Sequence, residues 1–109
     1  MEPIYNKQAH FEYEILEKYE AGLVLTGQEV KSIRAGQMNL KAAYVTIKHI
    51  PKPELTLINA HISPYKMAGR LPYYDPTHSR KLLMSRREIN SLLGKIEQKG
   101  LTLLPLRMV

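Results

Sequence analysis

Lys31 and Arg34 are two cations three residues apart, a type and spacing suited to binding an anion. Side chains three positions apart lie on the same side of a helix, so a helix over this stretch would present both charges together. Phosphate groups are the anions that Lys and Arg neutralise in nucleic-acid-binding proteins. The alternative is that both side chains belong to a solvated helix face and bind only water.

The helix that would position this pair is marked at both ends. Thr26 and Glu29 have the spacing of a capping box, in which the hydroxyl accepts from the Glu29 N–H and the carboxylate accepts from the Thr26 N–H. Gly36 can adopt the left-handed conformation that ends a helix. About two turns are too few to be stable alone in water. Tertiary packing must therefore hold the helix, with Val30 and Ile33 as its buried edge.

The net charge of the chain also favours a polyanionic partner. The 109 residues carry 16 Lys and Arg against 10 Asp and Glu, a net charge of +6. Residues 1–64 hold seven basic and seven acidic residues, whereas residues 65–109 hold nine basic and three acidic ones. The C-terminal part therefore carries the whole surplus. RNA, DNA and an anionic membrane all fit this charge.

The irregular stretch from Tyr65 to Lys81 combines cations with aromatic rings. It contains four prolines and glycines if Pro64 at its border is counted, and it interleaves Tyr65, Tyr73 and Tyr74 with Lys66, Arg70, Arg80 and Lys81. Stacking of a base on an aromatic ring contributes about 1–3 kcal/mol, and the cations bind phosphates. We expect an RNA-binding loop here, although each Tyr could instead pack against the protein.

Catalytic and metal-binding patterns are not found in the sequence. The four His residues, at positions 10, 49, 61 and 78, do not have ligand spacing, and neither a nucleophile elbow nor a Gly-rich phosphate loop follows a strand. With no cysteine, disulfides and Cys-based zinc sites are excluded. We expect no enzyme activity, no cofactor and no metal.

Targeting signals are missing from the sequence as well. The first residues do not resemble a signal peptide, and no apolar run approaches the ~20 residues of a membrane span. We expect a cytoplasmic protein that does not bind membranes. A chain of this length suits one domain over residues 1–109, burying ~65% of the surface that the unfolded chain exposes.

Alternating apolar residues predict most of the strands. Their expected ranges are 11–19, half-buried; 43–48 and 54–62, an antiparallel hairpin with its turn at Pro51–Pro53; 81–84; and 101–109. Within the hairpin, Leu55 and Leu57 should share one face, with Ile58, Ala60 and Ile62 on the other. Gly22, next to an apolar run, indicates a bulge or a close backbone approach.

A second helix is predicted to start at Ser85 and to end near Lys99. Ser85 and Glu88 form another capping box, and Gly100 can end the helix. Its apolar stripe, which we expect to be core, consists of Ile89, Leu92, Leu93 and Ile96. The elements together predict a mainly β fold with short helices. An OB-fold-like antiparallel barrel flanked by helices is the most economical arrangement, because a closed barrel has no exposed strand edges.

Four segments resemble the SsrA-binding protein (small protein B) family, the bacterial partners of transfer-messenger RNA. The longest runs from Glu20 to Leu40 and contains Gly-Gln-Glu-Val-Lys-Ser-Ile-Arg-Ala-Gly. The others, in the same order as in that family, are residues 59–64, Asp75-Pro76 with 80–83, and 100–105. The resemblance covers residues 6 to about 107. It implies binding to the tRNA-like domain of transfer-messenger RNA and delivery of that RNA to stalled ribosomes.

The resemblance also implies a set of RNA contacts. They are Asn6, Lys7, Glu20, Lys31, Arg34, Arg80, Lys81 and Leu83. Glu20 would be repelled by phosphates but can accept a hydrogen bond from a guanine or cytosine amino group. Leu83 is included because its family counterpart presents an apolar side chain to RNA; the pattern alone indicates core. His10 precedes Phe11, where the family usually has His, which leaves the role of that His open.

Two other functions fit the residues without the resemblance. One is a generic single-stranded nucleic-acid-binding module, and the other is a ribosome-associated module that binds no RNA of its own. The resemblance further implies that strands closing the barrel and a basic tail follow in the family. We therefore expect the 109-residue chain to bind RNA without supporting tagging, and to be a monomer or to dimerise through an open sheet edge.

Overall fold

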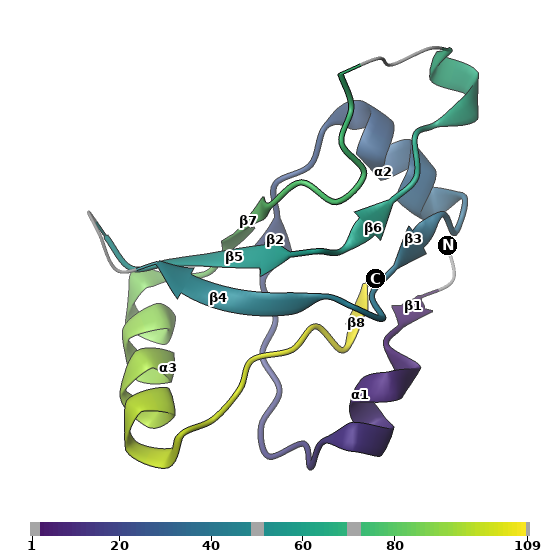
Figure 1. Ribbon diagram of the computed structural model, residues 1–109. Helices are drawn as coiled ribbons and strands as arrows, with labels where there is room; N and C mark the ends of the chain where they lie inside the picture. The colour runs from purple at the N-terminus through teal and green to yellow at the C-terminus, as the bar shows by residue number, and fades with distance from the viewer. Residues whose placement is uncertain (1–2, 49–51, 70–72, 109) are drawn as a thin grey trace.

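The computed structural model describes residues 3–48, 52–69 and 73–108. In chain order its elements are β1 (Ile4–Tyr5), α1 (Lys7–Glu12), β2 (Gly22–Leu23), α2 (Gly27–Arg34), β3 (Met38–Asn39), β4 (Tyr44–Lys48), β5 (Glu54–Ile58), β6 (His61–Ile62), the 3₁₀ helix η1 (Lys66–Ala68), β7 (Arg80–Leu83), α3 (Arg86–Lys99) and β8 (Arg107–Met108). Figure 1 shows α2 and η1 on one side of the central strands and α1 on the other.

The central sheet has four antiparallel strands in the order β2-β7-β5-β4. Strands β4 and β5 pair from Tyr44 opposite Ile58 to Lys48 opposite Glu54, which confirms the predicted hairpin. Its predicted turn includes Pro51, which lies outside the described residues, as do His49 and Arg70. Two short antiparallel ladders, β1-β8 and β3-β6, complete the described pairing. The fold is therefore mainly β with short helices.

The residues that face the core switch from odd-numbered to even-numbered positions at Asn59. Leu55 and Leu57 are buried, as expected for alternate positions on one face. Asn59 has a φ of 63°, in the left-handed region, and the next buried residues are Ala60 and Ile62. The predicted face assignment is therefore wrong beyond Ile58, because one left-handed residue turns the chain and puts even-numbered positions into the core.

The sheets do not close into a barrel in the described part of the chain. Residues 101–106 have no regular secondary structure, and a single backbone bond, from Val45 N–H to the Leu103 carbonyl at 3.3 Å, ties them to the central sheet. A largely apolar cavity of about 450 Å³ remains between the inner face of the sheet, α3 and the segments 13–19 and 100–108. The predicted final strand over residues 101–109 is thus wrong except at β8.

The predicted strand over residues 11–19 is also wrong. The chain instead forms α1, which ends at Glu12, and then runs without regular secondary structure to residue 21. Asn6 caps α1, because its side-chain oxygen accepts from the Ala9 N–H. Phe11, the first residue of the apparent alternation, is on the exposed side of α1 and is 90% exposed. The alternation that suggested a strand therefore begins in the last residues of a helix and continues through a segment that pairs with no described strand.

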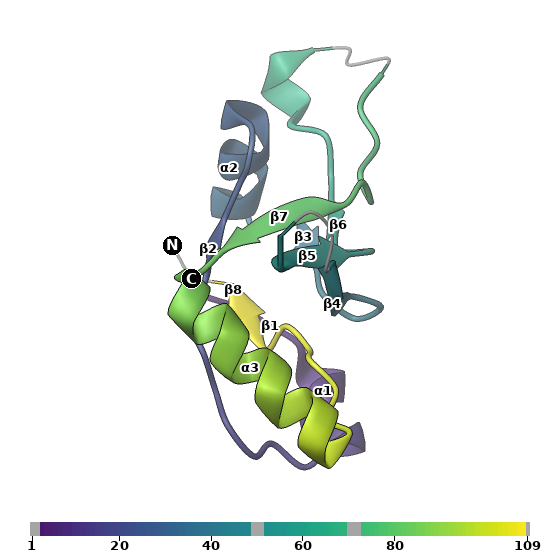
Figure 2. The ribbon, with the colours of Figure 1, turned by 90° about the vertical axis from the view of Figure 1, so that its left-hand side faces the viewer.

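Both remaining helices form close to their predicted limits. Helix α3 packs Ile89 and Leu92 against Leu55 on the inner face of the sheet, and Leu93 is partly buried beside them. The predicted stripe is therefore core at these three positions, whereas Ile96 is half-buried and lines the cavity. Figure 2 shows α3 and α2 at opposite ends of the molecule. Helix α3 ends at Gly100, which has a φ of 63° and adopts the left-handed conformation. Its N-terminus differs from the prediction in one detail, because the Glu88 carboxylate accepts from the Ser85 hydroxyl rather than from its N–H.

Candidate nucleic-acid interface

Helix α2 starts with the predicted capping box. The Glu29 N–H donates to the Thr26 hydroxyl at 3.2 Å, and the Thr26 N–H donates to the Glu29 carboxylate at 3.0 Å. Gly36 has a φ of 76° just after the helix, as the sequence predicts. Ile33 is buried and Val30 is half-buried, so both lie on the expected inner edge. Local sequence therefore determines where this helix begins and ends.

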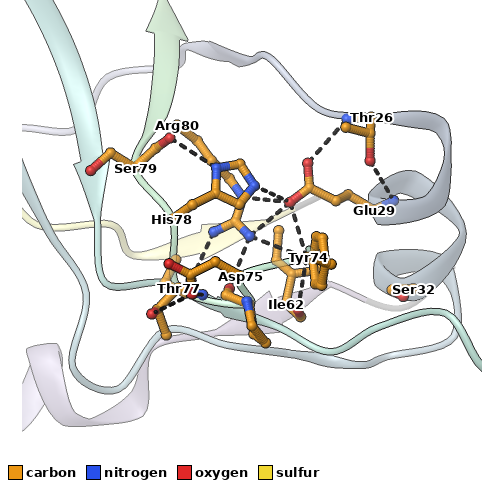
Figure 3. A network of polar contacts seen from close by, with 12 residues as sticks. Thr26, Glu29, Ser32, Ile62, Tyr74, Asp75, Thr77, His78, Ser79 and Arg80 are labelled. Atoms are coloured by element: carbon orange, nitrogen blue, oxygen red, sulfur yellow. Dashed lines mark hydrogen bonds and ion pairs between the residues drawn. The ribbon is translucent and has the colours of Figure 1, made fainter. Parts of the chain in front are cut away.

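The other carboxylate oxygen of Glu29 is the centre of a buried polar network (Figure 3). Only 1% of Glu29 is exposed. Its Oε2 accepts from Arg80 Nε at 2.7 Å, and the Tyr74 hydroxyl oxygen and His78 Nε2 lie 3.1 Å and 2.9 Å from it. A carboxylate can occupy this site because charge-assisted hydrogen bonds replace its lost hydration.

Arg80 directs its guanidinium into the protein. The residue is 2% exposed, and beyond Glu29 it donates to the backbone carbonyls of Ala60 at 2.8 Å and Pro76 at 2.9 Å. This side chain joins α2, the β5–β6 junction and the start of β7. The expectation that Arg80 contacts RNA does not fit this position, because a side chain without exposed surface cannot reach a phosphate.

Tyr74 and His78 attach the segment before β7 to the same carboxylate. The Tyr74 hydroxyl donates to the Ile62 carbonyl at 2.8 Å as well as facing Glu29, and its ring meets that of His78 edge-on. The two ring nitrogens of His78 face the Glu29 carboxylate and, at 3.1 Å, the Ser79 carbonyl.

The electrostatics of the network favour an ionised Glu29. Burial by itself raises the pKa of this carboxyl, but hydrogen bonds from the Thr26 backbone, Arg80 and His78 outweigh it and lower the pKa from 4.5 to about 2. Burial and the neighbouring Glu29 raise the pKa of the Tyr74 hydroxyl. The hydroxyl therefore stays neutral beside the carboxylate, and the network contains one anion and one permanent cation.

Lys31 and Arg34 lie on the exposed side of α2, as predicted. The Lys31 ammonium lies 5.6 Å from the centre of the Tyr65 ring, a cation–π distance. On the inner side of the same helix, the Ser32 hydroxyl donates to the Ser63 carbonyl at 2.7 Å. The helix and the start of the 65–81 loop therefore form one surface.

The outer face of the paired strands β2 and β7, called the β2–β7 face below, forms a second exposed surface. Gly22 lies opposite Leu83, and a Cβ added at Gly22 would be 3.3 Å from the Leu83 Cβ. The predicted alternatives were a bulge and a close backbone approach, but the atoms close to Gly22 belong to the Leu83 side chain. Leu83 is 51% exposed, so the core position that its pattern alone indicates is wrong. Lys81 is exposed beside it, 3.5 Å from Glu54 across the sheet.

The remaining predicted contacts lie in the N-terminal part of the chain. Asn6 is 4% exposed and donates from Nδ2 to the Pro105 carbonyl, whereas Lys7 is exposed on α1. Glu20 is exposed, directly after a surface cluster in which Lys95 of α3 contacts both Glu17 and Tyr19. Figure 1 shows α1 on the far side of the sheet from α2, so Lys7 is separate from Lys31 and Arg34.

The Glu29 network was missed by sequence reasoning. The sequence marks Glu29 as a capping residue, but its partner Arg80 is 51 positions away and no spacing pattern relates them. Tyr74 and His78 had no signal beyond their place in an aromatic and basic loop. In the described ranges no group of three or more His, Asp and Glu side chains is placed to hold a metal ion. Within those ranges, too, every helix is too short or too polar to cross a membrane.

Comparison with known proteins places these features in a family context. A family model described as SmpB protein matches residues 3–109. SsrA-binding proteins of Gloeothece citriformis and Acaryochloris marina are 59% and 55% identical over 103 residues, 94% of this chain and 64% and 65% of theirs. The chain thus spans just under two thirds of the length of these relatives. A solved chain from "tmRNA-SmpB: a journey to the center of the bacterial ribosome" matches with a TM-score of 0.73 and 46% identity, over 96% of this chain and 71% of that one.

Proposed function

Because this chain belongs to the SmpB protein family, we propose that it binds transfer-messenger RNA and acts with it in the rescue of stalled ribosomes. The match over residues 3–109 carries the proposal, supported by relatives named SsrA-binding protein. The related structure, described as tmRNA-SmpB at the bacterial ribosome, supports the same two partners. Because ribosomes are its second partner, the protein acts in the cytoplasm.

The surfaces available for RNA are the exposed side of α2 and the β2–β7 face. The proposed contacts are Lys31, Arg34, Lys81, Leu83, Glu20 and, on α1, Lys7. Their side chains are all exposed in the structure, which is the minimum that a contact requires. Asn6 and Arg80 support the contacts from inside, because Asn6 caps the helix that carries Lys7 and Arg80 anchors the strand that carries Lys81.

This arrangement suits a folded RNA better than a flexible single strand. A structured RNA is recognised by its shape, by phosphate contacts and by bases that are splayed out. Cations on α2 and on β7 come from elements that a buried network holds together, so they can match phosphates at fixed separations. An apolar side chain such as Leu83 can contact the face of an unstacked base.

The architecture behind these surfaces is proposed to be one OB-like domain over residues 1–109 in which the sheet is open. The support is the antiparallel four-stranded sheet and the link from Val45 to Leu103, which brings the C-terminal segment alongside β4. Such folds bind oligonucleotides on one face of the sheet.

Competition binding tests the function. The labelled 109-residue chain is bound to transfer-messenger RNA, and oligo(U) of equal length is the competitor. We expect transfer-messenger RNA to bind more than tenfold more tightly. Equal affinity would favour a generic single-strand binder instead, and no binding to either RNA would favour a ribosome-associated module without an RNA of its own.

A further inference from the structure

The buried pair of Glu29 and Arg80 joins the two elements that carry the proposed RNA contacts. Glu29 belongs to α2 and Arg80 is the first residue of β7. Both residues are almost completely buried, and their described polar contacts are all internal. Neither can touch an RNA directly, so any effect on binding must act through residues next to them.

The cations on α2 point away from this pair. The Glu29 carboxylate faces the interior, whereas Lys31 and Arg34 are exposed on the same two-turn helix. A helix of this length depends on tertiary contacts for its position. The Arg80 contact and the Ser32–Ser63 bond at 2.7 Å are contacts of this kind, so they determine where the two cations lie.

The strand β7 shows the same arrangement. Arg80 is buried and Leu82 half-buried, while Lys81 and Leu83 between and after them are exposed, because strand residues alternate between faces. Fixing the Arg80 side chain fixes the backbone from which Lys81 and Leu83 project. The pair of Arg80 with Glu29 therefore sets the position of the β2–β7 face relative to α2.

The network also immobilises the segment that leads into β7. Arg80 Nη2 donates to the Pro76 carbonyl at 2.9 Å, and the Ile62 N–H donates to the same carbonyl at 3.0 Å. The Tyr74 hydroxyl connects Glu29 with the Ile62 carbonyl. Residues 74–80 are consequently tied to the sheet on one side and to α2 on the other (Figure 3).

We propose that Glu29 and Arg80 are positioning residues for RNA binding. They hold the α2 cations and the β2–β7 face at the separation that the RNA requires. The proposal rests on the proposed function. A preorganised surface binds more tightly because less conformational entropy is lost on association. Without the pair, α2 would move relative to β7, and RNA phosphates could engage only one of the two surfaces at a time.

A variant with opposite predicted signs separates positioning from simple electrostatics. Glu29→Gln removes one negative charge, so electrostatic attraction alone predicts tighter RNA binding. The positioning role predicts weaker binding. Glu97→Gln, at an exposed position of α3, is the matched control with the same change in net charge. We expect it to bind as tightly as the wild type or slightly more tightly.

The salt dependence separates positioning from loss of folded protein. Partial unfolding lowers the active fraction but leaves RNA binding by the remaining molecules unchanged. A displaced α2 no longer reaches some of the phosphates, so the slope of log K against log salt becomes shallower by about 0.7–0.9 for each phosphate released. We expect Glu29→Gln to bind transfer-messenger RNA at least fivefold more weakly with a shallower slope.

Tyr74→Phe tests the same proposal with a milder change. It removes only the hydroxyl that bridges Glu29 and Ile62 and leaves the net charge unchanged. Circular dichroism at the assay temperature shows which variants are folded, and Tyr74→Phe decides the question if Glu29→Gln is unfolded. We expect a two- to fivefold loss of affinity, again with a shallower slope.

The outcomes distinguish this proposal from the function on which it rests. If folded Glu29→Gln matches Glu97→Gln in affinity and slope, or if folded Tyr74→Phe keeps the wild-type slope when it alone can be assayed, the positioning role is wrong. If the wild type shows no preference for transfer-messenger RNA over oligo(U), the proposed function fails instead.

Discussion

Glu29 on α2 and Arg80 on β7 form an ion pair, with Arg80 Nε 2.7 Å from Glu29 Oε2, and both residues are almost completely buried. Four segments meet at this pair: α2, the β5–β6 junction, residues 74–79 and β7. The charged atoms are satisfied by Thr26, Tyr74 and backbone carbonyls. The pair therefore connects local helix capping with long-range packing.

The first prediction concerns the stability that depends on this pair. Replacing Glu29 by Leu leaves the Arg80 guanidinium buried without its anion, and replacing Arg80 by Met leaves the Glu29 carboxylate without its cation. Breaking a buried pair from one side costs about 3–5 kcal/mol. Replacing both residues, as Glu29→Leu with Arg80→Met, removes the uncompensated charge and should cost less than either single change. Urea denaturation measures all three free energies. A double variant less stable than both single ones would show that the pair itself is strongly favourable.

The second prediction is a loss of stability in acid. The pKa of Glu29 is about 2 in the folded protein, against 4.5 for an ordinary Glu as in the unfolded chain. A pKa lowered by folding stabilises the folded state at pH values above the pKa of the unfolded chain. That stability is lost as the pH falls from 4.5 towards 2, by roughly 3 kcal/mol in total. Urea denaturation from pH 6 to pH 2 should show the free energies of wild type and Glu29→Gln converging over this range. Parallel curves would contradict the low pKa.

The local features of α2 could be predicted from the sequence because they depend on neighbours. Thr26, Glu29 and Gly36 determine the ends of the helix through interactions within the helix and its caps. The hairpin of β4 and β5 is local in the same sense. At Gly22 the sequence predicted a bulge or a close backbone approach, and the atoms that lie close are instead those of the Leu83 side chain.

The features that could not be predicted depend on distant parts of the chain. Arg80 looked like a surface cation, because its partner on α2 cannot be identified from spacing. The segment after Phe11 alternates like a strand but has no pairing strand in the described fold. Asn59 changes the buried face by adopting a positive φ, which Asn tolerates but does not require. Leu83 is exposed because Gly22 lies opposite it.

The third prediction concerns the Gly22–Leu83 contact. Gly22→Ala places a Cβ 3.3 Å from the Leu83 Cβ, so Leu83 must shift and we expect about 1 kcal/mol of destabilisation and weaker RNA binding. Gly94→Ala is the control: its Cβ meets no atom within 4 Å, and Ala is favoured over Gly inside a helix by about 1 kcal/mol. Thermal unfolding should therefore move in opposite directions for the two variants. A Gly22→Ala variant as stable as the wild type would show that Leu83 can shift without a cost in stability.

The fourth prediction concerns the cations of α2. Charge reversal by Lys31→Glu or Arg34→Glu should weaken binding to transfer-messenger RNA and lower the salt slope by about 0.7–0.9 for each phosphate that is no longer bound. Lys99→Glu, at the exposed end of α3, makes the same charge change away from both proposed surfaces. Filter binding at several salt concentrations compares the three variants. Equal slopes for all three would show that only net charge matters.

The measurement that tests the central claim most directly is a residue-by-residue map of the bound surface. The ¹⁵N-labelled chain is titrated with the tRNA-like domain of transfer-messenger RNA, and amide signals are followed by NMR. We predict that the signals of Lys31, Arg34, Lys81 and Leu83 change over the same range of RNA concentration, because α2 and the β2–β7 face bind as a single surface. Changes confined to α3 and the apolar cavity, with α2 and β7 unaffected, would contradict the account.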